Sequence, residues 1–318
     1  MASLRSLRRC ILAILSFLPS VTLLPAGPTA AAEKGIRDYA AQAAAPQGTR
    51  RIMFIAAKGG HGGRGNHEFH VGANYLARRI NELYPQAHAV VYTDDAWPET
   101  CADQDAIVVL LNHAGRAAND RRIADAMNRK AGFMAIHYGV EVDKGPQGDN
   151  YLDWIGGYFE KFWSVNPHWK PEIKVHATHP TARGVQPFSV NDEWYYHMRF
   201  REGMQGVTPI LSAVAPLSSL RNPEKPSSHG GNPDVLRAVQ AGEPQHLAWA
   251  YDRPDGGRGF GFTGYHNFAN LGNDEFRTVL LNGVAWVAKL DIPADGVPSP
   301  PLSAEQLDAL LDEVHGKK

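Results

Sequence analysis

Histidines stand at the ends of several predicted strands, where their chemistry could be shared. The first predicted strand is followed by His61, His67 and His70, and others end at His113, His137 and His266. In an open α/β sheet, ligands bind outside the carboxyl ends of the strands. Such a fold brings these histidines to one rim, and we therefore predict a shared functional site there.

A histidine cluster supports two kinds of chemistry. Neutral imidazoles bind a borderline metal such as zinc, and a histidine beside a carboxylate acts as general acid or base because its pKa lies near working pH. His67 and His70 are three residues apart on a predicted helix, but HEFH is not the HExxH pattern of zinc proteases. The sequence establishes no cofactor and leaves a divalent metal open.

Two adjacent carboxylates and a group of rings are the other candidates. Asp192 and Glu193 precede the predicted strand 194–200, and their side chains would point to opposite faces if extended, so at most one reaches the site. The candidate catalytic residues are His137, Glu193, Asp192 and His67, and the candidate substrate-binding residues are Tyr138, Trp163, His168, His266 and His61.

The glycine-rich segment has a competing interpretation. GHGGRG at residues 60–65 formally matches the dinucleotide fingerprint GxGxxG between a strand and a helix. However, three extra residues separate it from the strand, and the candidate ribose-binding acid, Asp94, lies about thirty residues on instead of about twenty. No GK[ST] follows, so a Walker phosphate site is excluded, and we do not predict dinucleotide binding.

Apolar strands alternate with amphipathic helices along the chain. Alternation of this kind favours an α/β domain with a mostly parallel sheet and helices on both faces, in three layers. The predicted strands are 50–57, 88–94, 105–113, 132–137, 172–177, 194–200, 208–214, 246–251 and 258–266, and the main predicted helices are 67–83, 119–130 and 274–290. An elaborated insert is expected between residues 140 and 240.

Composition and the ends of the chain suggest an exported protein. Of the 318 residues, 43% are hydrophobic and 20% charged, with a net charge of −1, so no nucleic-acid partner is predicted. We interpret residues 1–32 as a signal peptide cleaved near Ala32, which leaves no stable membrane span and a periplasmic or extracellular location. Residues 33–49 are a tether, 50–291 the domain, and 292–318 a Pro-rich connector with a short helix. Ser303 and Gln306 are predicted to form a capping box at the start of this helix. Cys101 is expected to be a free thiol rather than a nucleophile.

Short motifs in a fixed order resemble the ThuA-like family, named for trehalose utilisation, over residues 51–290. They are HEF (67–69), AIHYG (135–139), GGYF (156–159), HPTARGV (179–185), DEWY (192–195) and GFTGYHNF (261–268). The resemblance implies a flavodoxin-like fold similar to class I glutamine amidotransferases, with His137 near the position of their cysteine nucleophile. Amidotransferase chemistry is then excluded, because an imidazole replaces the thiolate.

The family association implies a small carbohydrate ligand. Tyr138 and the segment 139–150 depart from the family pattern, so the implication does not extend to trehalose itself.

Three hypotheses for function follow. The first is an exported hydrolase or isomerase acting on a glycoside or 3-keto-glycoside, with His137 as acid or base and a neighbouring carboxylate as its partner. The second is a non-catalytic carbohydrate-binding module, and the third is a metal-dependent hydrolase. The sequence leaves the choice, the sugar and the oligomeric state open. The deciding observation is whether His67, His137, His266 and Glu193 surround a common point.

Overall fold

The structure, a computed structural model, describes residues 48–222 and 224–316. The predicted signal peptide and nearly all of the predicted tether lie outside the described residues. Within the described part of the chain, no helix is long and apolar enough to cross a membrane.

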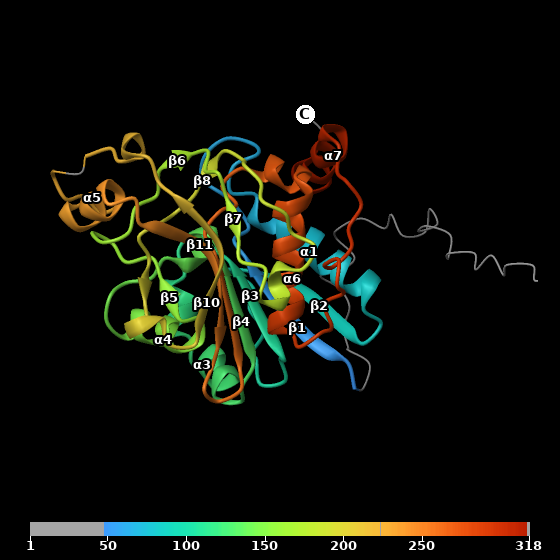
Figure 1. Cartoon of the computed structure of the whole chain (residues 1–318). Coiled ribbons are helices and arrows are strands. Elements are labelled where there is room, and N and C mark those ends of the chain that lie inside the picture. The colour runs from blue at the N-terminus through green and yellow to red at the C-terminus, as the bar shows by residue number, and fades with distance from the viewer. Residues whose placement is uncertain (1–47, 223, 317–318) are drawn as a thin grey trace, which may run out of the picture. The chain divides into compact units, whose positions relative to one another are not determined.

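An eight-stranded sheet forms the centre of the domain (Figure 1). Its strands are, in spatial order, β2 (Ala87–Thr93), β1 (Arg50–Ala56), β3 (Ala106–Leu110), β4 (Gly132–Ile136), β12 (Arg258–Phe262), β11 (Pro244–Asp252), β10 (Val207–Val214) and β7 (Lys174–Val175). Neighbours from β2 to β12 pair in parallel, whereas the pairs from β12 to β7 are antiparallel. The predicted α/β fold with a mostly parallel sheet is confirmed.

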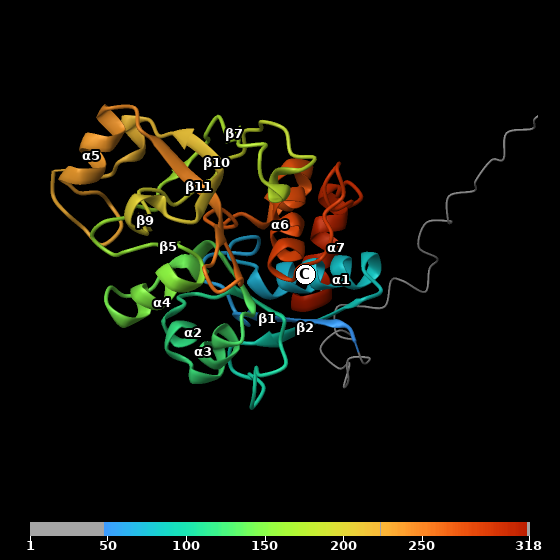
Figure 2. The same ribbon diagram turned by 60° about the horizontal axis from the view of Figure 1, so that its bottom comes forward.

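Helices cover both faces of this sheet, so the domain has three layers (Figure 2). One layer contains α1 (Phe69–Leu83), α6 (Asp274–Val287) and α7 (Ala304–His315), and the other contains α2 (Gly115–Asn119), α3 (Arg121–Asn128) and α4 (Pro146–Trp154). Strand residues alternate between the two cores: Phe54 packs in the first, and its neighbours Met53 and Ile55 pack in the second. Strands covered on both faces must be apolar at every position, which explains their continuous hydrophobic runs.

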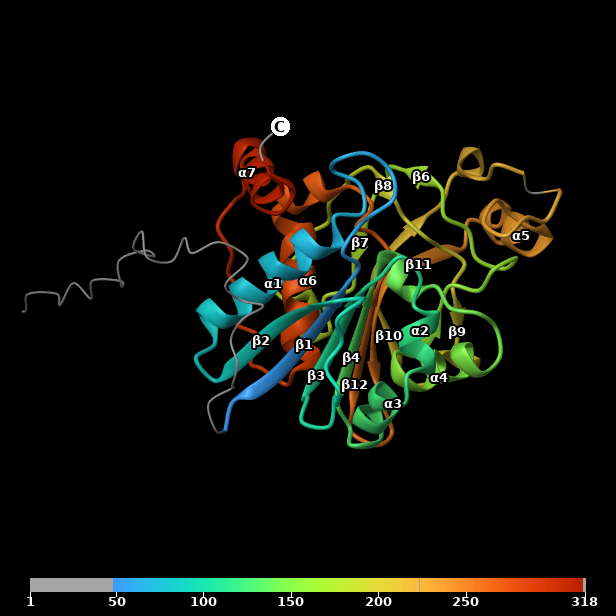
Figure 3. The same cartoon turned by 180° about the vertical axis from the view of Figure 1, so that it is seen from behind.

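The insert between β4 and β10 is mostly irregular and lies beside the antiparallel half of the sheet (Figures 1 and 3). Four of its strands form short pairs, β5 (Gly157–Tyr158) with β9 (Arg199–Phe200) and β6 (His168–Trp169) with β8 (Asp192–Glu193), while β7 joins the main sheet beside β10. Helix α5 (Pro233–Gln240) follows β10. The prediction of one strand over 194–200 is wrong. His197 has φ of 55°, a left-handed conformation that ends an extended segment.

The C-terminal helix α7 belongs to the main core. Ser303 and Gln306 form the predicted capping box at its start. Leu307, Leu310 and Leu311 are buried in the same hydrophobic core as α1 and α6.

Candidate metal centre

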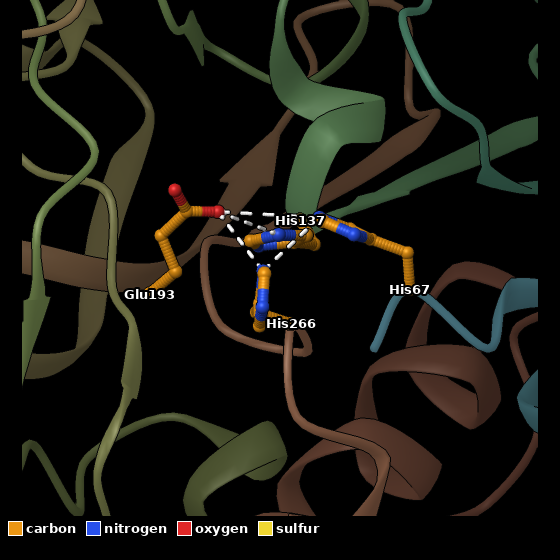
Figure 4. A group of neighbouring side chains, drawn as sticks. All are labelled: His67, His137, Glu193 and His266. Atoms are coloured by element: carbon orange, nitrogen blue, oxygen red, sulfur yellow. Dashed lines mark hydrogen bonds and ion pairs between the residues drawn. The ribbon is translucent and has the colours of Figure 1, made fainter. Parts of the chain in front are cut away.

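Four side chains from distant parts of the chain converge at the carboxyl ends of the parallel strands. His67 follows the long loop after β1, His137 follows β4 directly, His266 follows β12, and Glu193 ends β8. Each offers one ligand atom, and these atoms all lie within 4.8 Å of one another (Figure 4). The three sheet strands concerned are close neighbours, so the topology places their ends on one rim, as the strand-end pattern predicts.

Backbone carbonyls fix the tautomers of two of the histidines. The Nδ1 atom of His67 lies 2.7 Å from the carbonyl oxygen of His61, and Nδ1 of His137 lies 2.9 Å from that of Thr263. A carbonyl only accepts hydrogen bonds, so both Nδ1 atoms carry protons and both Nε2 atoms present lone pairs. Metal-binding histidines typically have this arrangement, in which the outer N–H orients the ring.

Around the common point, acceptor atoms outnumber the available protons. Nε2 of His137 lies 3.4 Å from Oε2 of Glu193, and Nε2 of His67 lies 4.0 Å from the same oxygen. Nδ1 of His266 is 3.2 Å from this oxygen and 3.1 Å from Nε2 of His67, and its single proton can bridge one of those contacts. Lone pairs at these distances repel each other unless a cation lies between them.

The two adjacent carboxylates have different tasks. Glu193 points into the cluster, and its second oxygen accepts a hydrogen bond from Nδ2 of Asn166 at 3.0 Å. Asp192 points the opposite way and is fully buried, where it accepts hydrogen bonds from the backbone amides of Tyr265 and His266. The prediction that only one of the pair reaches the site agrees with this placement. Asp192 instead holds the turn that carries His266.

Electrostatics favour the metal-binding protonation states. Burial, reinforced by the neighbouring imidazole of His137, lowers the pKa of His67 to about 3, so this ring is neutral at physiological pH. Burial alone would raise the pKa of Glu193, but its close contacts with the imidazoles of His137 and His266 outweigh burial and hold this pKa well below its ordinary value. A carboxylate with neutral imidazoles is the form that binds a divalent cation.

Some of the described residues with positive φ lie in the cluster or next to it. Non-glycine residues with positive φ include His67 (52°) and His137 (53°), and Tyr265 (99°) immediately precedes His266. Such conformations cost of order 1–3 kcal/mol each and persist where the surrounding structure enforces them. His137 also begins a short 3₁₀ turn, η3 (His137–Val140), directly after the extended backbone of Ile136.

Most of the predicted substrate-binding residues surround the cluster, and one does not. The exposed ring of His61 stacks on His67 at 4.0 Å, Tyr138 lies 5.6 Å from His61, and exposed His168 lies 4.5 Å from His266, as centroid distances. Trp163 packs elsewhere, under the guanidinium of Arg199 at 3.7 Å. Its aromatic surface is therefore covered by a cation, which does not support the predicted sugar-contacting role.

Two residues of the site were missed from the sequence. Tyr195 is fully buried, and its hydroxyl lies 3.3 Å from Nε2 of His137. Burial and the negative charge of Glu193 raise its pKa well above the ordinary value, so it stays protonated. Side chains two residues apart in an extended segment lie on the same face, so the sequence could have placed Tyr195 beside Glu193. Asn166 carried no comparable signal, because only the pairing of β6 with β8 brings its segment to Glu193.

Two other candidates lie outside the cluster. β3 ends at Leu110, so His113 lies three residues beyond the strand that was predicted to end at it. Its Nδ1 accepts a hydrogen bond from the backbone of Gly115, and it is not one of the four converging residues. Cys101 is buried, and burial raises the pKa of its thiol to about 11, as expected for a structural cysteine rather than a nucleophile.

The residue set fits a divalent transition metal. Three imidazole nitrogens and one carboxylate oxygen match the donor types and the number that zinc takes in proteins. The outer hydrogen bonds on His67, His137 and Glu193 supply the orientation that such ligands need.

Comparison with known proteins identifies the family. No curated protein matches the chain. A crystal structure of a ThuA-like protein from Bacteroides uniformis ATCC 8492 is similar in fold, with a TM-score of 0.51 and 16% identity over 77% of this chain and 94% of that one. SMU.1228c aligns with a TM-score of 0.35 and 8% identity over 83% of this chain and 98% of that one. The family model described as "ThuA: Trehalose utilisation" matches residues 64–287, and the chain belongs to this family.

Proposed function

We propose that this protein is a metal-dependent enzyme of carbohydrate metabolism, with His67, His137, Glu193 and His266 as the ligands of one divalent ion of the zinc class. The observation that carries the proposal is the convergence of four acceptor atoms within 4.8 Å, with two imidazole tautomers fixed by backbone carbonyls. The family's association with trehalose utilisation supports a carbohydrate substrate.

The surrounding residues supply the rest of the chemistry. A bound divalent ion supplies Lewis-acid polarisation of a substrate oxygen. Tyr195 holds a proton 3.3 Å from Nε2 of His137 and can donate a hydrogen bond to negative charge that develops on that oxygen. Glu193 and His266 lie on the less buried side of the cluster, where a substrate hydroxyl or carbon acid can reach them. A glycoside or 3-keto-glycoside provides such oxygens and acidic protons.

Metal analysis tests this proposal directly. The purified protein should contain or take up one equivalent of zinc or a similar ion by elemental analysis and calorimetry. Saturation at 100 times the dissociation constant should stabilise the fold by about 2.7 kcal/mol, and a chelator should reverse this.

Matched alanine variants make the test specific to the centre. His67→Ala should abolish stoichiometric binding, whereas His179→Ala should not. His179 is also buried, but it bonds to Thr181 and packs on Trp286. Stoichiometric binding by His67→Ala would refute the assigned ligand set.

A second candidate is metal-free acid–base catalysis, favoured by the direct contacts of Glu193 with His137 and His266. In this version His137 exchanges a proton with the substrate and Glu193 stabilises the imidazolium. Exhaustive chelation separates the two, since only the metal-free version retains full turnover. His137→Ala should abolish turnover in both.

We also propose that the protein is exported. The support is the basic, apolar and small-residue pattern of residues 1–32. N-terminal sequencing of the mature protein should find a start near Glu33, and an intact Met1 terminus in the cytoplasm would refute export.

A further inference from the structure

The glycine-rich loop before His67 depends on contacts from elsewhere to hold its shape. Five of the seven residues 59–65 are glycine, which loses more conformational freedom on ordering than any other residue. Residues 58–63 are exposed, and a cavity of about 480 Å³ lies between the loop and the end of α7. Apolar packing therefore contributes little to this loop, and polar contacts must determine its position.

The position of this loop sets which ring nitrogen of His67 faces the metal centre. Nδ1 of His67 donates a hydrogen bond to the carbonyl oxygen of His61, in the loop, at 2.7 Å. Gly60 lies so close that an added Cβ would be 2.6 Å from the carbonyl oxygen of His67. If the loop moved away, Nδ1 would lose its acceptor, and either ring nitrogen could carry the proton. A proton on Nε2 would remove the lone pair that a bound metal requires.

Arg64 connects the loop to the C-terminal helix α7. Its Nη2 donates to Oδ1 of Asp312 at 2.7 Å and to the backbone carbonyl oxygen of Asp308 at 3.2 Å. The side chains of Arg64 and Asp312 are only 20% and 31% exposed, and partly buried ion pairs are screened less than exposed ones. Since α7 is anchored in the core by three buried leucines, Arg64 ties the loop to a fixed point.

Glu68, the residue directly after His67, makes a second connection to α7. Its Oε2 lies 2.6 Å from Nε2 of His315, the last residue of the helix. A carboxylate only accepts hydrogen bonds, so this nitrogen is the donor. The other oxygen of Glu68 accepts a hydrogen bond from the backbone amide of Gly65 at 2.9 Å, which closes the end of the loop. We call Arg64, Glu68, Asp312 and His315 the C-terminal latch.

The helix that carries half of this latch lies beyond the part of the chain that matches the family. The family model ends at residue 287, whereas α7 spans Ala304–His315. All four converging residues of the metal centre lie within the match. Helix α7 is thus an addition to the matched domain that reaches back to the loop beside the centre.

From these contacts we propose that the C-terminal latch positions the metal centre. It holds the loop so that the His61 carbonyl keeps the proton of His67 on Nδ1 and leaves Nε2 free. The latch residues are positioning residues, because they act through the loop and contact none of the reacting groups. The proposal rests on the proposed function for the metal, but the effect on the proton of His67 exists without one.

Nitrogen-15 NMR of the histidine rings tests the latch on the full-length, metal-free protein at pH 7. In the wild type, His67 should carry its proton on Nδ1. In the double variant Arg64→Ala/His315→Ala, a clear share should carry it on Nε2. His137 is the internal control, because the Thr263 carbonyl holds its Nδ1 proton, and it should not change. Zinc affinity by calorimetry should fall about tenfold, the lower end of what loss of an outer hydrogen-bond partner costs a metal site.

Two further variants separate the latch from general effects on stability. Asp308→Asn removes a carboxylate that is 72% exposed and 3.7 Å from Arg64, but it keeps the backbone carbonyl that Arg64 contacts. It should leave the proton of His67 and the zinc affinity unchanged. Arg64→Lys retains the positive charge opposite Asp312 and should keep the proton of His67 on Nδ1.

The outcomes distinguish the latch from the metal centre. The latch is refuted if His67 in the double variant keeps its proton on Nδ1, whatever happens to zinc affinity, or if the wild type already carries it on Nε2. If the double variant does not fold, Asp312→Asn should show the same change to a smaller extent, and an unchanged His67 would refute the latch. A wild type that binds no stoichiometric zinc, but whose His67 proton depends on the latch, would retain the latch and refute the metal centre.

Discussion

Replacing Asp192 by asparagine should destabilise the whole domain, although the change is isosteric. Asp192 accepts five hydrogen bonds, from the amides of Glu193, His266 and Asn267 at Oδ1 and from the amide of Tyr265 and the side chain of Asn270 at Oδ2. An asparagine must point its NH₂ group at one of these two sets of donors. The smaller set contains two.

The size of the effect follows from these two donors. Each buried donor left without an acceptor costs about 1–3 kcal/mol, so Asp192→Asn should lose about 2–6 kcal/mol. At about 2–4 °C per kcal/mol for domains of 150–250 residues, the melting temperature should fall by roughly 5–20 °C. Because the same carboxylate holds the turn that carries His266, zinc affinity should fall as well.

Differential scanning calorimetry with zinc titration checks this, with Glu193→Gln as the adjacent isosteric control. The control can still accept the hydrogen bond from Asn166, so it should lose metal affinity with a smaller change in melting temperature. The reasoning is refuted if Asp192→Asn melts within about 2 °C of the wild type, since two lost acceptors cannot cost so little.

Three further outcomes are expected. The metal-free protein should lose stability as pH falls from 6.5 toward 3, because the pKa of His67 in the folded state lies below its ordinary value and the unfolded chain takes up the proton first. In urea melts at a series of pH values, the free energy of unfolding of His67→Asn should depend less steeply on pH than that of the wild type. Gly72→Ala should destabilise the protein by about 1–3 kcal/mol, because a Cβ at this position would lie 1.5 Å from the Tyr265 hydroxyl. Gly63→Ala, whose Cβ would meet open space, should not, and equal denaturant midpoints for the two variants would contradict this. Cys101 should resist a thiol reagent at pH 8 in the native protein and react after unfolding, because burial raises the pKa of its thiol to about 11. Rapid labelling of the native protein would contradict this prediction.

The sequence by itself determined the sheet, most of its elements and the identity of the four converging residues. Fully apolar strands such as 50–57 have one stable location, between two helical layers, and the carboxyl ends of parallel strands share a rim. Histidines at those ends could therefore be assigned to one site before their positions were known. The same local signals identified the capping box of the terminal helix.

Only the tertiary structure decided which atoms of these residues face the common point. Carbonyls of His61 and Thr263 accept hydrogen bonds from Nδ1 of His67 and His137, so both Nε2 lone pairs are free, as a metal ligand and a general base both require. Trp163 shows the same limit, because only the folded structure places the guanidinium of Arg199 over its ring. Burial and hydrogen-bond partners arise from contacts between segments far apart in the chain, and no local pattern of residue types contains them.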